Sequence, residues 1–145
     1  MKFHEESNPD NLAQPDGHFS QCTLVQAGTS LLFISGQVPR DTEGRTVGIG
    51  DMNRQAEQVF GNLQAALNAH GAGFENVVKA TIYVTRMDLA HEVVVVRERF
   101  YGKSKPASTF VGVTALNDPE WWLEVELVAA LPASHRSKAG IQAFA

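Results

Sequence analysis

The sequence predicts an α+β fold in which two helices cover one face of a mixed sheet of about six strands. Two segments repeat apolar residues every three or four positions, and other segments alternate apolar with polar residues. Their order along the chain is strand, strand, helix, strand, helix, strand, strand. Two helices can cover only one face of such a sheet, yet the strands carry apolar residues on both. We therefore expect the uncovered face to pack against other copies in a homo-oligomer.

Composition limits the classes of protein that this chain can belong to. Its 145 residues are 43% hydrophobic and 19% charged, with a net charge of -4, which fits one soluble domain. The acidic balance provides no basic surface for nucleic acid. No apolar run approaches the ~20 residues of a membrane span, and the N-terminus lacks the apolar core of a signal peptide. We expect a cytoplasmic protein without nucleic-acid or membrane partners.

The chain divides into three parts by composition. Residues 1–16 are polar and contain turn-forming residues, which predicts an irregular arm. Residues 17–131 contain all the expected strands and helices and form the domain. Residues 132–145 are poor in apolar side chains over most of their length, so we expect a mobile C-terminal tail.

The first half of the domain is predicted as two strands followed by a loop and a helix. Residues 19–27 and 31–34 are strand candidates, and the short segment 28–30 between them predicts a hairpin. Residues 38–50 form a loop with a short pairing near Thr46 and Val47. From Asp51 to His70 the apolar residues recur with helical spacing, and glycines follow directly.

The second half is predicted as a strand, a helix and two more strands. Residues 78–84 alternate as a half-buried strand does. A helix capped by Asp88 then places Leu89, Val93, Val96 and Phe100 on one side, although the valines at 93–96 favour a strand by propensity. Arg97 and Arg99 flank this stripe, and we expect them to be a solvated surface.

Two carboxylates mark the last predicted strand, which runs to residue 131. Because side chains alternate along a strand, Glu124 and Glu126 share one face, opposite Leu123, Val125 and Leu127. Carboxylates beside Leu and Val are costly to bury without a partner. We therefore expect the two carboxylates on this face to be solvated, to be bonded to a partner, or to take part in function. The five histidines are scattered without ligand spacing, so we expect no metal site.

Several stretches, taken together and in order, resemble the Rid family, also called YjgF-like proteins. They cover roughly residues 15–131. The matching stretches are Gly17-His18-Phe19-Ser20-Gln21, Phe33-Ile34-Ser35-Gly36-Gln37-Val38-Pro39, the helix starting at Gln55, residues 77–84, Pro106-Ala107-Ser108, and Leu123-Glu124-Val125-Glu126.

The resemblance implies a fold similar to the bacillus type of chorismate mutase, assembled as a trimer whose sheets form a central barrel. Small-molecule ligands would bind in three clefts between subunits, without a cofactor. Type members of the family hydrolyse imine and enamine intermediates that pyridoxal phosphate enzymes release. The resemblance also implies that Glu126 matches the carboxylate that holds the attacking water.

The chain departs from the family pattern at the expected ligand site. Ser108 stands where the family has an arginine that grips the substrate carboxylate, and a hydroxyl cannot supply that charge. The expected site otherwise keeps Ser35, Gly36 and Gln37. Other positions become more apolar: Phe19 replaces a tyrosine, Val94 an asparagine and Phe110 a cysteine.

Three functions follow from these residues. The first is a Rid-like hydrolase in which Glu126 places a water, while Phe19, the Ser35–Gln37 segment, Ser108 and Phe110 contact the substrate. Its substrate would differ from the usual small 2-imino acids. The second is a non-catalytic trimer that binds a small ligand, and the last is RNA cleavage, which the acidic charge disfavours.

Each of these site residues also has a purely structural interpretation. Glu126 can form an ion pair within an oligomer, and Glu124 can be solvated or paired across strands. The Ser108 hydroxyl can bond to neighbouring backbone, and the two phenylalanines can simply pack. An arginine from a neighbouring subunit is a further possible replacement for the missing charge.

Overall fold

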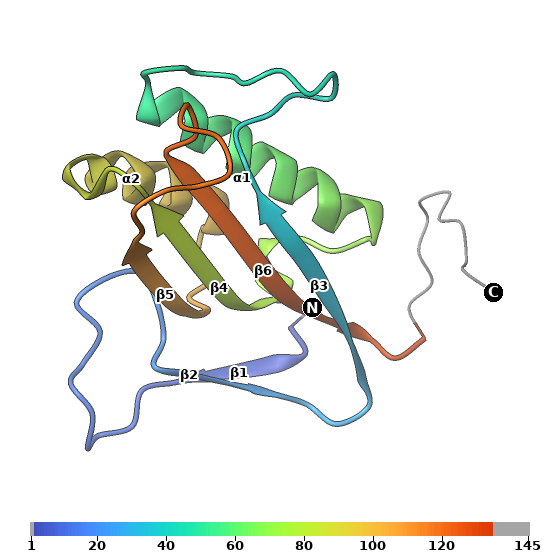
Figure 1. Ribbon diagram of the computed structural model, residues 1–145. Helices are drawn as coiled ribbons and strands as arrows, with labels where there is room; N and C mark the ends of the chain where they lie inside the picture. The colour runs from blue at the N-terminus through green and yellow to red at the C-terminus, as the bar shows by residue number, and fades with distance from the viewer. Residues whose placement is uncertain (1, 135–145) are drawn as a thin grey trace.

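The computed structural model describes residues 2–134 (Figure 1). Their six strands form a four-stranded and a two-stranded sheet, with two α-helices and two short 3-10 helices. The elements are β1 (His4–Ser7), β2 (Cys22–Val25), β3 (Thr29–Gln37), α1 (Met52–Ala69), η1 (Phe74–Asn76), β4 (Val77–Val84), η2 (Met87–Leu89), α2 (Ala90–Tyr101), β5 (Ala107–Gly112) and β6 (Leu123–Pro132).

The main sheet has the strand order β3-β6-β4-β5 and is mixed. β6 runs antiparallel to both of its neighbours, whereas β4 and β5 are parallel and connected through α2. Both helices lie on the same side of this sheet (Figure 1). The predicted α+β class, with two helices on one face of a mixed sheet, is confirmed. The mixed sheet has four strands and not about six, because β1 and β2 pair with each other in a separate sheet.

The core lies between the sheet and the helices. α1 contributes Val59, Phe60 and Leu63, and the sheet contributes Ile82 and Val125, all of them fully buried. Asp51 caps α1, since its side chain accepts a hydrogen bond from the Arg54 backbone at 3.1 Å. The periodicity that predicted this helix therefore reflects its buried stripe.

Gln55 joins α1 to the segment that leads into β6. This side chain is fully buried, and its Nε2 donates to the backbone oxygens of Gly48 and Glu120 at 3.1 and 2.9 Å. The Trp122 backbone N–H donates to Gln55 Oε1 at 2.8 Å. One side chain thus fixes two loops and the start of the strand that carries both carboxylates.

Four expectations about the secondary structure were wrong. Part of the supposed irregular arm is β1, which pairs with β2, so the expected hairpin between the strands at 19–27 and 31–34 does not form. β3 instead pairs with β6 and continues through Gln37, where we expected the strand to have ended. Asp88 does not cap α2, because it lies in η2 and pairs with Arg86 at 2.7 Å. The expected mobile tail lies largely outside the described residues.

Candidate functional site on the open sheet face

The face of the sheet opposite the helices carries the polar residues of β4 and β6. In the β4–β6 register Thr81 is opposite Glu126, and Tyr83 is opposite Glu124. Residues directly opposite each other share a face. The predicted grouping of Glu124 with Glu126, away from Leu123, Val125 and Leu127, is confirmed, because these three side chains are buried.

Glu126 is held by a neighbouring tyrosine. The Tyr83 hydroxyl donates to Glu126 Oε1 at 2.9 Å. This hydrogen bond is the main reason why the pKa of Tyr83 is raised, and burial and the charges of Glu126 and Glu124 act in the same direction. The phenol therefore stays protonated at neutral pH and remains a donor. With Oε1 engaged, Oε2 of the exposed carboxylate is the oxygen left to accept a hydrogen bond from a ligand or water.

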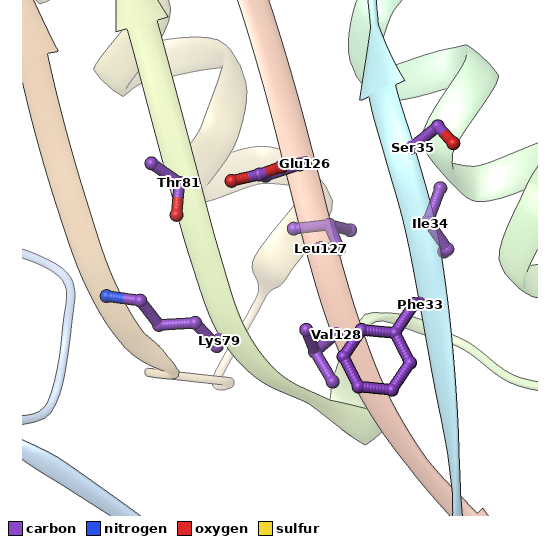
Figure 2. A pocket seen from close by; sticks show the side chains of 8 residues that line it. All are labelled: Phe33, Ile34, Ser35, Lys79, Thr81, Glu126, Leu127 and Val128. Carbon is purple, nitrogen blue, oxygen red and sulfur yellow. The ribbon is translucent and has the colours of Figure 1, made fainter.

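A hollow of about 380 Å³ lies on this face beside Glu126. In Figure 2, the Glu126 side chain extends from β6 toward β4, where Thr81 lies on the same face, and Phe33 lies beside Val128. Lys79 Nζ, at the same hollow, donates to Thr109 Oγ1 at 2.8 Å. The lining residues are Phe33, Ile34, Ser35, Lys79, Thr81, Glu126, Leu127 and Val128.

Glu124 lies over the backbone of the Ser35–Gln37 segment. A β-carbon on Gly36 would be 2.5 Å from Glu124 Oε1, so glycine leaves the space that this carboxylate occupies. The register of β3 against β6 shifts between Ile34 and Gln37, and Gln37 Nε2 donates to the Ser35 backbone oxygen at 3.1 Å. The structure thus brings Ser35, Gly36 and Gln37 to the same strand pair as the two carboxylates.

The remaining predicted site residues lie elsewhere. Ser108 pairs with Ala80 and Phe110 with Ile82, and both partners are buried on the helix side. Phe19 is next to Ser20, which bridges to Ala107 at the start of β5. Within one chain, Ser108 and Phe110 therefore face the opposite side of the sheet from Glu126. One site containing all the predicted residues would need side chains from two copies.

Arg97 corrects an expectation about the second helix. We expected a solvated side chain, but the residue is only 5% exposed, whereas Arg99 is exposed and pairs with Glu57. The signal was available in the sequence, because Arg97 falls four residues after Val93 and four before Tyr101, on a buried side of α2. Sequence reasoning also missed Tyr83, whose alternation with buried Ile82 and Val84 places it on the open face.

The described residues contain neither a cluster of metal-binding side chains nor a helix that could span a membrane. Between residues 2 and 134, His, Cys, Asp and Glu side chains nowhere gather in a group of three or more that a metal ion could bridge. Within the same range, neither helix is both long enough and apolar enough to cross a bilayer.

The fold and the two carboxylates on an open sheet define a class of small α+β proteins with one uncovered sheet face. Residues 10–131 match the family model described as Endoribonuclease L-PSP. The chain belongs to this family, which includes the Rid, YjgF and RutC proteins. The predicted family resemblance is thereby confirmed.

Individual relatives agree with this assignment. A RutC family protein of Pyrococcus horikoshii is 34% identical over 120 residues, which cover 83% of this chain and 92% of the relative. A 2-iminobutanoate/2-iminopropanoate deaminase of Dermatophagoides farinae is 31% identical over 103 residues, covering 71% and 78%. The solved structure of YyfB, a Rid family protein of unknown function from Yersinia pestis, has a TM-score of 0.80 and 30% identity, covering 89% and 99%.

Proposed function

We propose that this chain is a hydrolase that converts a small imine or enamine into a carbonyl compound and ammonia. The observation that carries the proposal is the exposed Glu126 carboxylate, oriented by Tyr83 at 2.9 Å beside the hollow on the open face. The deaminase named among the relatives supports the same reaction class.

The reaction needs a group that activates water and returns a proton. Water hydrogen-bonded to Glu126 Oε2 adds through its oxygen to the carbon of the C=N bond, while the carboxylate takes one of its protons. The carboxylate returns this proton to the nitrogen, which gives a carbinolamine, and the carbinolamine loses ammonia as the carbonyl forms. An enamine enters the same path once a proton has added to its β-carbon and converted it to an iminium. The Tyr83 hydrogen bond fixes the rotamer of the carboxylate, so that Oε2 stays available throughout.

The substrate differs from the usual small 2-imino acids in this proposal. Those acids need a fixed positive charge beside their carboxylate, and Ser108 provides only a hydroxyl. The apolar Phe19 and Phe110 next to this position favour substrates with more carbon surface. Ser35, Gly36 and Gln37 contribute the polar contacts.

The proposal includes a cytoplasmic homotrimer with ligand clefts between subunits. Two features support assembly: Leu31 and Phe33 on the open side of β3 are 49% and 71% exposed, and the predicted site residues lie on two faces of one sheet. An apolar sheet face of this kind is typically covered by another chain. Contact between copies would also bring Glu126 of one chain toward the Ser108 side of another.

The test is an ammonia-release assay that compares 2-iminobutanoate, generated in situ by an amino-acid oxidase, with larger imines that lack a carboxylate, generated in situ by an amine oxidase. We expect turnover of larger imines, little turnover of 2-iminobutanoate, and a loss of about 10²- to 10³-fold in kcat for Glu126→Gln. Glu124→Gln, measured in parallel, decides which carboxylate positions the water, and Lys103→Gln on the exposed surface is the control. A full rate for Glu126→Gln would overturn the assignment of Glu126.

Two further measurements, a thermal-shift assay and an RNA-degradation assay, separate the two rival functions from this one. A non-catalytic binding trimer would show a ligand-dependent rise in Tm without ammonia release from any imine. An RNA-cleaving protein would degrade RNA with a steep dependence on salt concentration.

A further inference from the structure

The imidazole of His4 on β1 is buried without a hydrogen-bond partner. Its side chain is 0% exposed, and neither ring nitrogen has a partner within hydrogen-bond distance. In a neutral imidazole one nitrogen donates and the other accepts, so both capacities are unused here. A buried polar group without a partner destabilises the state in which it is buried. Contact with water would therefore stabilise this ring if β1 left its place.

The carboxylate of Glu6 lies close to this ring and connects β1 to a distant part of the chain. Alternation along the strand places Glu6 on the same face as His4. Glu6 Oε1 accepts hydrogen bonds from Lys2 Nζ at 2.8 Å and from the Lys105 backbone N–H at 3.1 Å. His4 Nε2 is 3.6 Å from the same oxygen, just beyond hydrogen-bond distance. One carboxylate oxygen thus joins the N-terminal strand to the segment that enters β5.

This connection holds β1 at one end of the main sheet. β1 and β2 lie across the end of the sheet at which β4 and β5 begin (Figure 1). Thr23 Oγ1 donates to Val78 O at 2.6 Å, which attaches β2 to β4. The hydrogen bond from Lys105 to Glu6 is the corresponding attachment of β1.

The surroundings of His4 disfavour a charged imidazolium. Burial lowers the pKa of His4, Lys2 acts in the same direction, and Glu6 opposes both. Glu5 lies on the other face of β1 and is exposed, and β2 carries no charged side chain. The positive side chains on β1, on β4 and on the connection before β5 are Lys2, Lys79, Lys103 and Lys105.

A proton on His4 can be accommodated in two ways, and each breaks the bond from Lys105. If the imidazolium stays buried, it needs the Glu6 carboxylate as its partner, and this draws the carboxylate away from the Lys105 N–H. If the imidazolium is instead to be hydrated, β1 must leave its buried position, because the side chain has no contact with solvent there.

We propose that His4 and Glu6 form an acid-sensitive latch, which holds β1 against the segment entering β5 at neutral pH and releases it when His4 takes up a proton. The latch does not depend on the proposed function, since neither residue lines the hollow on the open face. Release affects the start of β5, because Ala107, two residues after Lys105, bridges to Ser20 in the segment that leads into β2.

The direction and size of the pH effect follow from the buried ring. Because the pKa of His4 is lowered when β1 is in place, the stability of this state is complete above the ordinary histidine pKa of about 6.5 and falls below it. If the buried ring stays neutral, the equilibrium constant for release rises about tenfold from about pH 7.5 to 5.5. Burial would raise the pKa of Glu6, but the hydrogen bonds from Lys2 and Lys105 lower it, so this carboxylate stays charged over that range.

The test is native-state hydrogen exchange of the full chain, read by NMR at the Lys105 and Gln26 backbone N–H groups. Gln26 reports on β1 as well, since its N–H donates to Phe3 O at 3.0 Å. After correction for the intrinsic exchange rate, we expect the protection of both to fall by up to about tenfold over that pH range. His4→Leu, which keeps an apolar side chain of similar size, should abolish the fall. His91→Gln on the exposed surface is the control and should retain it.

Two results would overturn the latch. If protection falls equally in the wild-type chain and in His4→Leu, another group causes the pH dependence. A ring titration of the wild-type chain by NMR provides the second result. If His4 titrates above about pH 6.5 while Lys105 stays fully protected in acid, an ion pair with Glu6 holds the strand in place instead of releasing it. This titration decides the question even if His4→Leu does not fold.

Discussion

Replacing Gln55 with leucine tests whether one buried amide fixes the start of β6. Leucine has a similar size but can neither donate to Gly48 and Glu120 nor accept from Trp122. The change therefore leaves two backbone oxygens and one backbone N–H without their partner. Because Gln55 is fully buried, water cannot simply take the place of its amide.

The expected effect follows from these three hydrogen bonds. Each buried polar group that loses its partner costs about 1–3 kcal/mol. Glu120 is exposed and can rehydrate, and the new apolar side chain gains some burial, so the costs do not add in full. We expect Gln55→Leu to lower the free energy of unfolding by about 2–4 kcal/mol.

Urea unfolding at one fixed protein concentration measures this loss, since an oligomer's stability depends on concentration. Gln64→Leu is the matched control, because Gln64 is exposed on the same helix and should change the unfolding free energy by less than about 0.5 kcal/mol. If Gln55→Leu and Gln64→Leu have equal effects, the three hydrogen bonds do not stabilise this part of the fold.

Two further predictions concern the open face. Tyr83 should titrate above the ordinary tyrosine pKa of about 10, and Glu126→Gln should bring its pKa back toward that value in an absorbance titration. Because the pKa is raised in the folded state, the stabilisation from this bond is present below the ordinary pKa and disappears as the pH rises through the raised one. An unchanged Tyr83 titration in the variant would contradict the bond. Separately, Phe33→Lys should convert an oligomer into smaller species in sedimentation experiments, because Phe33 is 71% exposed on this face. A wild-type chain that sediments as a monomer would rule out the assembly.

Secondary structure was predictable where side-chain spacing alone determines it. The periodic apolar residues and Asp51 correctly located α1, and alternation located β4 and β6. Helical spacing also prevailed over the strand propensity of four successive valines in α2, because Val93 and Val96 are both buried in the core.

Strand partners were not predictable, because pairing depends on distant segments. Gly28 does adopt a positive φ of 77°, as a tight turn favours, but β2 and β3 on either side of it join different sheets. β3 pairs with β6, which lies far along the chain. A local turn signal cannot reveal this choice.

The candidate site was predictable only in part for a related reason. Strand alternation placed Glu124 and Glu126 on one face without further information. Assigning Ser108 to a face required the register of β5 against β4, which the sequence does not contain. Arg97 was missed because we treated charge as a sign of exposure, although its position four residues from Val93 placed it on a buried side of the helix.

Ser108 and Glu126 lie on opposite faces of the sheet, and this arrangement affects which residues can change during evolution. Side chains on opposite faces do not pack against each other, so substitutions on one face leave the geometry of the other largely intact. Residues on the helix side of β5, such as Ser108, can therefore vary during evolution while the Tyr83–Glu126 hydrogen bond on the open face is retained. If Glu126 acts as we propose, new specificities can arise on one face of the sheet without any change to the carboxylate on the other.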